Sequence, residues 1–371
     1  MTGASRPYLS APSRPELPAL TGLRALAALW VVCWHASTYL PTLPFPITRG
    51  WFGVDVFFVL SGFVISYVYW NDFAEQGGGR YGHFLGLRIA RLWPAHVCVM
   101  LAVLALTAAS ALLQPDADID WGRLLAEVPL HLLLAHNWGV FADTRLNFPS
   151  WSVSAEFFAY LLFPLYVALF DRLRGVAVLL ISMVAAALSC WLALAVLLDV
   201  PLNTSGRIGQ IRVVCEFAIG VAAFRLWCLP EVQRLPWTAI TLVALGAFSA
   251  LILFDVPVLD FVLVLLVAPI VMGLARHRGP LVRGLSVRPM VYLGEISYSV
   301  YLVHALAIQT VDWCLRRAGM VPQPAPEIGW AFMAASIVLS LAGGALLFHV
   351  VEKPARYWLR ARLRQTDPAP G

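Results

Sequence analysis

The chain has 371 residues, of which 60% are hydrophobic and only 13% are charged. A globule of this length needs more polar surface, so the composition excludes a water-soluble protein and indicates a polytopic protein whose partner is a lipid bilayer. The formal charge of +5 is spread over short basic pieces between apolar runs, with no basic patch interleaved with aromatic residues, which excludes nucleic acid as a partner.

Ten apolar stretches are each long enough, at about 20 residues, to cross a bilayer as a helix. We therefore predict an all-α integral membrane protein, a bundle of about ten transmembrane helices. The expected organisation is a cytoplasmic N-terminal leader over 1–18, a membrane domain over 19–354 and a cytoplasmic basic tail over 355–371. The predicted spans cover residues 19–40, 51–70, 90–113, 151–170, 175–198, 207–228, 236–254, 257–275, 290–312 and 328–351.

The orientation follows from the basic residues. Most Lys and Arg residues fall in segments on the same side as the two termini, which predicts that both termini are cytoplasmic. The basic residues are almost all Arg, and Ala and Leu are abundant, a composition typical of GC-rich bacterial genomes. We therefore expect the cytoplasmic (inner) membrane of a bacterium.

The first predicted span carries two polar residues, Arg24 and His35, in the run ALTGLRALAALWVVCWHAS. Eleven positions at about 100° each bring both side chains to one face of a helix, roughly 16 Å apart along its axis. A charged side chain at the centre of a membrane helix costs about 2.5 to 3.5 kcal/mol on insertion scales, so such residues usually face the protein interior and serve a function. A hydrogen-bonded core histidine is the structural alternative for His35.

Three later spans each place another titratable side chain in the outer part of the membrane. Helix rise from the predicted boundaries puts Asp55, Glu156 and His304 at about the depth of His35. Histidine supplies a general base near neutral pH, and a carboxylate can orient its ring and stabilise the imidazolium. The alternative for Asp55 is a negative charge at a helix start, and the alternative for His304, on one stripe with Tyr301, is hydrogen bonding between helices.

The third span begins near Arg88 and Arg91, which are i and i+3 neighbours on a helix. That spacing presents two guanidinium groups to one anionic group such as a phosphate, and Arg24 lies on the same cytoplasmic side. Ordinary anchoring of basic residues at the cytoplasmic edge is the alternative.

Other features of the chain have simpler structural interpretations. Arg212 and Glu216, at i and i+4, predict an ion pair within one helix. Lys353 and Pro354 mark the end of the last span, where Lys reaches the interface and Pro stops the helix. The segment 114–150 does not span, and it contains a helix expected to lie on the outer surface or to cap the bundle. The six cysteines form no CxxC pair and no Cys/His ligand spacing, so we expect neither a disulfide framework nor a metal site.

Five motifs together resemble the membrane-bound acyltransferase-3 family, which includes bacterial O-acetyltransferases of surface glycans. They are Arg24 with ten residues before His35, GWFGVDVFFVLSGFVIS around Asp55, RIAR at Arg88 and Arg91, PSWSVSAEFFAYLLFP around Glu156, and EISYSVYLVH ending at His304. The resemblance covers nearly the whole chain and implies that His35 is the catalytic base and that Arg24, Arg88 and Arg91 bind the donor. The commonest form of the fourth motif has two adjacent acidic residues, whereas Glu156 is followed by Phe157.

The resemblance implies transfer of an acyl group, usually acetyl, from cytoplasmic acyl-CoA to a hydroxyl group of a carbohydrate or glycoconjugate acceptor. We therefore predict an O-acyltransferase with His35 as general base, with Glu156 or Asp55 orienting it, and with no metal. The residues expected to bind substrate are Trp151, Ser154, Tyr298, Tyr301 and His304.

Several alternatives stay open at the level of sequence. Some relatives continue into a soluble esterase-like domain, so either this chain acylates its acceptor directly or a separate extracytoplasmic acyl-handling protein completes the transfer. A proton-coupled transporter would use the same buried ionisable residues, and a structural or assembly subunit is a third reading. The acceptor, the acyl chain length and the oligomeric state are not encoded in any motif.

Overall fold

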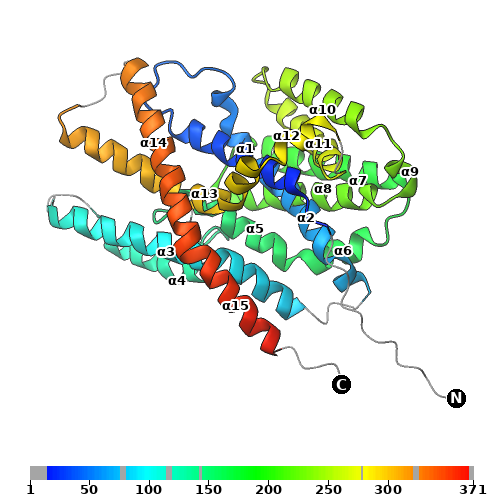
Figure 1. Cartoon of the computed structure of the whole chain (residues 1–371), viewed down its shortest axis with the longest axis horizontal. Helices are drawn as coiled ribbons and strands as arrows, with labels where there is room; N and C mark the ends of the chain where they lie inside the picture. The colour runs from blue at the N-terminus through cyan, green and yellow to red at the C-terminus, as the bar shows by residue number, and fades with distance from the viewer. Residues whose placement is uncertain are drawn as a thin grey trace.

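The computed structural model describes residues 15–75, 81–113, 119–141, 144–276, 279–320 and 326–366, so most of the predicted leader and the end of the tail lie outside it. Within these residues the secondary structure is helical and contains no strand, which confirms the predicted all-α class (Figure 1). The α-helices are α1 (Pro18–His35), α2 (Gly53–Ala74), α3 (Tyr81–Leu113), α4 (Trp121–Leu132), α5 (Trp151–Leu161), α6 (Phe163–Phe170), α7 (Val176–Trp191), α8 (Gly209–Trp227), α9 (Pro230–Gln233), α10 (Trp237–Leu251), α11 (Pro257–Leu274), α12 (Pro280–Leu285), α13 (Arg288–Arg317), α14 (Pro326–Leu347) and α15 (Lys353–Thr366).

Six helical segments of the described chain are long and apolar enough to cross a membrane. They are Ile47–Ala74, Tyr81–Leu112, Val176–Leu197, Pro257–Leu274, Arg288–Arg317 and Glu327–Leu363. The pair Phe148–Leu161 and Phe163–Phe170, bent by 51°, makes a seventh if it counts as one span. The predicted number of ten is therefore not confirmed, and the cytoplasmic position of the termini stays a prediction. Helices α1 and α8, which we predicted as spans, contain Arg24 and Arg212 and are not among the six.

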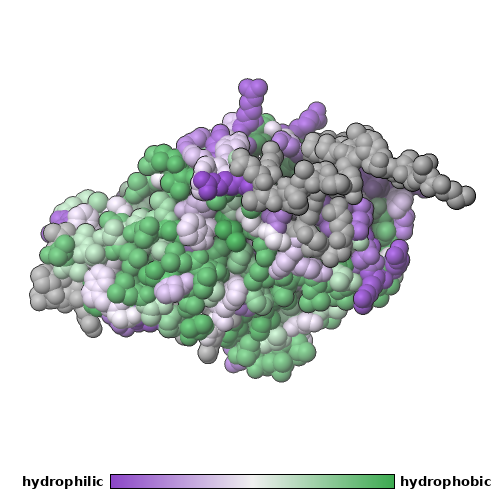
Figure 2. All heavy atoms as spheres, turned by 90° about the horizontal axis from the view of Figure 1, so that it is seen from below, coloured by the Kyte–Doolittle hydropathy of each residue, from purple (hydrophilic) through white to green (hydrophobic). Residues whose placement is uncertain are grey.

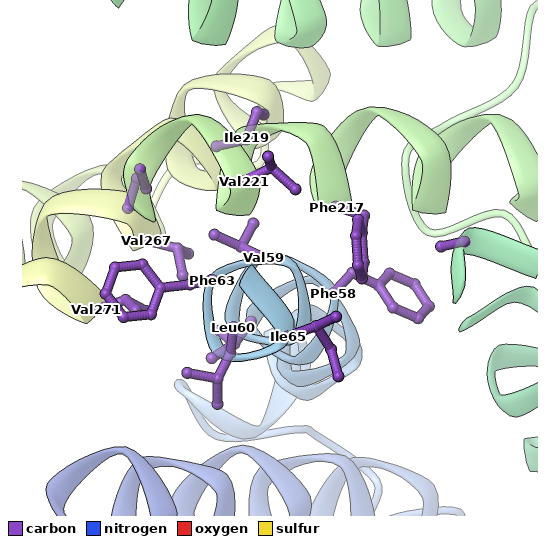
Figure 3. Packing of buried hydrophobic residues seen from close by; sticks show 14 of the residues in the cluster. Phe58, Val59, Leu60, Phe63, Ile65, Phe217, Ile219, Val221, Val267 and Val271 are labelled. Atoms are coloured by element: carbon purple, nitrogen blue, oxygen red, sulfur yellow. The ribbon is translucent and has the colours of Figure 1, made fainter. Parts of the chain in front are cut away.

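Helix α2 lies among several other helices of the bundle. Its residues are apolar on nearly every side, the pattern of a helix that is buried all round. Figure 3 looks along α2 and shows Val59, Leu60 and Phe63 pointing outward from it in different directions, with apolar residues of α8 and α11 around them. This packing holds rigidly the helix that carries Asp55 and Ser61.

Helices α2 and α8 approach each other closely where two glycines face across the contact. A Cβ added to Gly220 would lie 2.0 Å from the carbonyl oxygen of Val59, and one added to Gly62 would lie 2.2 Å from the carbonyl oxygen of Phe217. Small residues let helix backbones come this close in membrane bundles.

Gly220→Ala is expected to destabilise the protein, because the two backbones must separate to admit the methyl group. Overpacking of this kind costs about 1–3 kcal/mol. The matched control is Gly246→Ala in α10, where nothing lies within 4 Å of the added Cβ. Thermal unfolding of both variants in one detergent should show a lower Tm for Gly220→Ala alone. Equal Tm values would contradict the close approach of α2 and α8.

Helices α14 and α15 form one long rod that runs diagonally across Figure 1. The apolar segment of span length covers Glu327–Leu363 and passes through a π-helical turn at Phe348–Glu352. The prediction that Pro354 stops the last span is therefore wrong. Pro354 is the second residue of α15 and directly follows the π-helical turn, where the regular backbone hydrogen bonding is already altered, so the helix continues across it. As a result the basic tail continues as a helix that packs against α3.

The helix predicted in the non-spanning segment is present as α4. Asp120 caps it by accepting a hydrogen bond from the backbone N–H of Arg123 at 2.9 Å. Leu124 of α4 packs against Met100 of α3 and against Leu146. The helix therefore lies along α3, as Figure 1 also shows, and covers one side of the bundle.

Large hydrophobic side chains cover much of the outer surface. Figure 2 shows them across the broad middle of one face, while hydrophilic residues gather along one edge. Examples that are more than half exposed are Ile181, Leu197, Val243 and Val338. Contiguous apolar surface of this extent marks a membrane-facing or interacting surface, and it agrees with a multi-pass membrane protein.

Candidate active site

A cavity of about 230 Å³ lies between helices α1, α2, α3, α5, α13 and α15. It is lined by the predicted site residues Arg24, Arg88, Arg91, Glu156, Tyr298 and Tyr301. Its other polar lining residues are Ser61, Ser152, Tyr160, Ser297 and Arg360. Cavities of about 430 and 450 Å³ elsewhere contain none of the predicted site residues, so the cavity of about 230 Å³, which contains six of them, is the candidate active site.

The predicted donor arginines meet in this cavity although they come from two helices. Arg24 of α1 donates a hydrogen bond to Ser297 of α13 at 3.2 Å. Arg88 of α3 donates to the hydroxyl of Tyr69 at 2.7 Å, and its guanidinium lies 5.0 Å from the centre of that ring. Arg91 makes no hydrogen bond or ion pair within the described residues, so its guanidinium is free to bind a ligand.

A second cavity of about 300 Å³ shares Arg24 and Arg91 with the first. Lys353 and Arg356 line it too, and Arg360 of the same helix lines the first cavity. Sequence reasoning missed these three residues because we expected the helix to stop at Pro354. The i, i+4 spacing of Arg356 and Arg360 would have placed them on one face had the helix been predicted to continue.

Glu156 lies on the cavity wall and is held by hydroxyl groups. Ser61 of α2 donates to it, and Tyr160, one turn further along α5, donates at 2.5 Å. No ion pair to Glu156 occurs within the described residues, so its carboxylate is positioned by neutral donors and faces the same space as the arginines.

The two predicted intramembrane histidines contact each other. His35 Nδ1 lies 3.2 Å from His304 Nε2, and the ring centres are 4.9 Å apart. Since Arg24 also contacts α13, through Ser297, both polar residues of α1 face that helix, which confirms that they share one side. The ring of His304 lies in turn beside that of Tyr301, at 5.4 Å between ring centres and tilted by 49°, and Tyr301 lines the cavity.

The hydrogen bonds of this pair determine where the protons lie when both rings are neutral. His304 Nδ1 contacts the carbonyl of Tyr301, so it must carry a hydrogen, and His304 Nε2 is then an acceptor. His35 Nδ1 contacts that acceptor and the carbonyl of Val31 at 3.1 Å, so it must be a donor. The lone pair of His35 is therefore on Nε2, which is buried and has no hydrogen-bond partner. A histidine in this state is ready to accept a proton.

No carboxylate hydrogen-bonds to His35 within the described residues, so neither Asp55 nor Glu156 is in direct contact with it in this structure, and an orienting role for either carboxylate stays a prediction. Asp55 is fully buried and accepts two hydrogen bonds from Arg212, at 2.7 and 2.6 Å. The expected pair of Arg212 with Glu216 is also present, at 3.5 Å, but it is the longer contact. The carboxylate of Asp55 is thus bound by the buried guanidinium of Arg212 and not by His35. The side chain that contacts His35 Nδ1 is His304.

Two residues predicted to bind substrate have structural contacts instead. Ser154 is buried, donates to the carbonyl of Leu134 at 2.7 Å and accepts from the N–H of Asn137 at 3.1 Å. Trp151 is buried with its ring 5.6 Å from the guanidinium of Arg212. Neither lines the cavity, because α5 turns these two side chains toward the turn after α4 and toward α8.

The two predicted tyrosines line the cavity and are fixed by backbone acceptors. Tyr298 donates to the carbonyl of Leu92 at 2.7 Å. Tyr301 donates to the carbonyl of Pro149 at 3.0 Å and lies 2.8 Å from the hydroxyl of Ser152. Tyr301, whose ring centre is 5.4 Å from that of His304, connects the cavity to the histidine pair.

Comparison with known proteins shows the family to which the chain belongs. The family model described as an acyltransferase domain, of the acyltransferase-3 type, matches residues 17–349. The chain is 29% identical to the acyltransferase MdmB of Streptomyces mycarofaciens, over 96% of each chain. It is 23% identical to the O-acetyltransferase OatA of Staphylococcus aureus, over 78% of this chain and 50% of that protein, so it spans about half of that relative. No solved structure matches the chain.

Proposed function

Since this chain belongs to the acyltransferase-3 family and is an acyltransferase, we propose that it moves an acyl group, acetyl in the first instance, from cytoplasmic acyl-CoA to a hydroxyl group. The acceptor is a surface glycan or a glycosylated molecule. The names of the relatives, acyltransferase and O-acetyltransferase, support the transfer to oxygen. The observation that carries the proposal is the free Nε2 of His35, held beside His304 and linked through Tyr301 to a cavity lined by arginines.

The donor would be held by its phosphates. Arg24, Arg88 and Arg91 converge on the cavity, and guanidinium groups bind phosphate through charge-assisted, often bidentate hydrogen bonds. The adjoining cavity, with Lys353 and Arg356, offers further positive charge to the same ligand. The pantetheine arm would then extend past Tyr301 toward the histidine pair.

The transfer itself needs one base. His35 Nε2 takes the proton of the acceptor hydroxyl while its oxygen attacks the thioester carbonyl carbon, and the C–S bond breaks. The imidazolium then gives that proton to the departing thiolate, so the products are an ester and free CoA. His304 holds His35 in the tautomer that this step requires, and no metal takes part. A separate extracytoplasmic acyl-handling protein is required only if the purified chain binds donor without transferring it.

The test is transfer by the protein purified in detergent, with radiolabelled acetyl-CoA and a mixed glycan extract. Label released by mild alkali from the glycan fraction supports O-acylation. Donor binding without transfer points to a missing acceptor or partner protein. Absence of both binding and transfer would refute the assignment of the cavity to acyl-CoA.

Arg91→Ala is expected to raise the KM for acetyl-CoA about tenfold or more while changing kcat less. Arg91 has no hydrogen-bond or ion-pair partner among the described residues, so its removal costs the ligand one charged hydrogen-bonding group, about 1.5–3 kcal/mol, without breaking a bond seen in the structure. Arg88→Ala also frees Tyr69 and is the less clean test. Steady-state kinetics with varied acetyl-CoA measure the change, and Arg283→Ala, an exposed arginine of α12, is the control. An unchanged KM would remove Arg91 from the donor site.

A further inference from the structure

Three buried histidines gather outside the active-site cavity. His96 comes from the middle of α3, His131 from the last turn of α4 and His136 from the turn that follows. One ring nitrogen from each lies within 4.8 Å of the other two, and the residues are 0%, 0% and 2% exposed. None of them has a part in the acyl transfer proposed above.

The Nε2 atom of each ring faces an acceptor. His96 Nε2 lies 3.2 Å from the carbonyl of His131, and His136 Nε2 lies 3.0 Å from the carbonyl of Ser150. Carbonyl oxygens only accept hydrogen bonds, so both Nε2 atoms carry hydrogen and both Nδ1 atoms of the neutral rings carry the lone pair.

His131 also carries its hydrogen on Nε2, as two successive hydrogen bonds through Thr144 to Glu127 show. Its Nε2 lies 2.9 Å from the hydroxyl oxygen of Thr144, and that hydroxyl donates its own hydrogen to Glu127 at 3.0 Å. His131 Nε2 must therefore donate to Thr144, which leaves the lone pair on Nδ1. The Glu127 carboxylate is also 3.6 Å from this Nε2.

The three Nδ1 atoms have no hydrogen-bond partner although all are buried. The carbonyl of Leu130, which accepts the N–H of Ala135 at 2.8 Å, also interacts with His136, but no hydrogen bond joins it to His136 Nδ1 within the described residues. Buried polar atoms are normally paired, so three unpaired acceptors in one place require an explanation.

We propose that His96, His131 and His136 bind one zinc ion through their Nδ1 atoms. Neutral imidazole is a preferred zinc ligand, and a site with three histidines leaves a fourth position for water. The hydrogen bonds from Nε2 to carbonyl and to the Thr144 and Glu127 pair are the outer contacts that orient zinc-binding histidines. This site revises the expectation from sequence that the chain holds no metal.

Binding requires the three rings to rearrange. The three ring planes are almost parallel, with angles of 5° to 8° between them. Tetrahedral zinc with bonds of about 2.0–2.1 Å brings ligand nitrogens to about 3.3 Å from one another. The rings must therefore tilt about their Cβ–Cγ bonds until the Nδ1 atoms point to one centre.

The position of the site indicates what the ion would do. It ties α3 to the end of α4, and His136 also contacts both the hydroxyl and the carbonyl of Ser150, the residue before α5. Helix α5 carries Ser152 and Glu156 into the active-site cavity. Bound zinc would thus hold the segment between α3 and α5 against α3 and stabilise the position of the first residues of α5.

The experiment measures zinc directly. The full chain, purified in detergent through a tag without histidine, is equilibrated with Zn²⁺, desalted and analysed by inductively coupled plasma mass spectrometry. We expect one zinc per chain in the wild type and in His349→Ala, an exposed histidine of the π-helical turn near the last helix. His131→Gln and His136→Gln should each bind at least about 100-fold more weakly in competition with a chromophoric chelator.

Two further measurements separate metal binding from folding. Glu127→Gln keeps all three histidine ligands and should weaken the affinity for zinc by about tenfold. Chelation should lower the Tm of the wild type and leave the Tm of His131→Gln unchanged. A wild type without stoichiometric zinc, or variants that bind it as tightly as the wild type, would overturn the proposal. Neither readout depends on acyl transfer, so this proposal stands or falls apart from the proposed function.

Discussion

His35→Ala is expected to lower the rate of acyl transfer by about 10²–10⁴-fold, the usual contribution of a general base. The variant removes the only ring nitrogen of the histidine pair that has a free lone pair. Donor binding should persist, because the arginines proposed to hold the phosphates line the cavity, whereas His35 is not among its lining residues. Initial rates and acetyl-CoA binding, measured on the same preparation, separate the two effects.

The control for this prediction is His349→Ala, which changes an exposed histidine outside the cavity and should leave the rate unchanged. Full activity of His35→Ala would refute a base at this position. Loss of donor binding together with activity would instead mean that the variant disturbs the packing of α1 against α13.

In the proposed mechanism His304 acts through His35, so substitution of His304 tests that role. His304→Gln keeps an acceptor for His35 Nδ1, whereas His304→Phe removes it. We expect Gln to retain much of the rate, and Phe to lower kcat and shift the acidic limb of the pH–rate profile. Equal rates and pH profiles for both variants would assign His304 a packing role only.

Arg212→Met is expected to have the largest effect on stability and to lower the free energy of unfolding by about 3–5 kcal/mol. Arg212 is 1% exposed and holds the fully buried Asp55 through two hydrogen bonds. Glu216 also lies 3.5 Å from the guanidinium of Arg212. Removing this guanidinium therefore leaves the carboxylates of Asp55 and Glu216 close together without a cation. Breaking a buried pair from one side is costly because the remaining charge has no compensation.

The variants of this cluster should rank in a fixed order. Asp55→Asn leaves Arg212 with Glu216 as a partner, so it should lower the Tm less than Arg212→Met. The double variant Asp55→Leu with Arg212→Met removes both charges and should recover part of the loss. The control Arg316→Met breaks the exposed pair with Asp312 and should leave the Tm unchanged. A greater loss for Asp55→Asn than for Arg212→Met would show that Glu216 carries no charge in the folded protein.

Much of this protein follows from local patterns in its sequence. Hydrophobic runs and their lengths depend on neighbouring residues alone, so the all-helical class was predictable. The 3.6-residue period placed Arg24 and His35 on one side of α1, and the i, i+3 spacing paired Arg88 with Arg91. The motifs that resemble the acyltransferase-3 family were read in the same way, and the family match confirms them.

The tertiary structure decided which side chains meet. His304 and His35 are 269 residues apart, Arg212 and Asp55 are 157 apart, and His96 lies 35 residues before His131. Helix period sets the face on which a residue lies, but the partner of that face depends on the packing of the whole bundle. For this reason we expected Asp55 to lie near His35, whereas the structure shows Asp55 bound by Arg212 of α8. For the same reason the spacing of His96, His131 and His136 in the sequence did not reveal that they lie together. Arg360 reached the cavity because the last helix continues past Pro354, a consequence of its packing along α3.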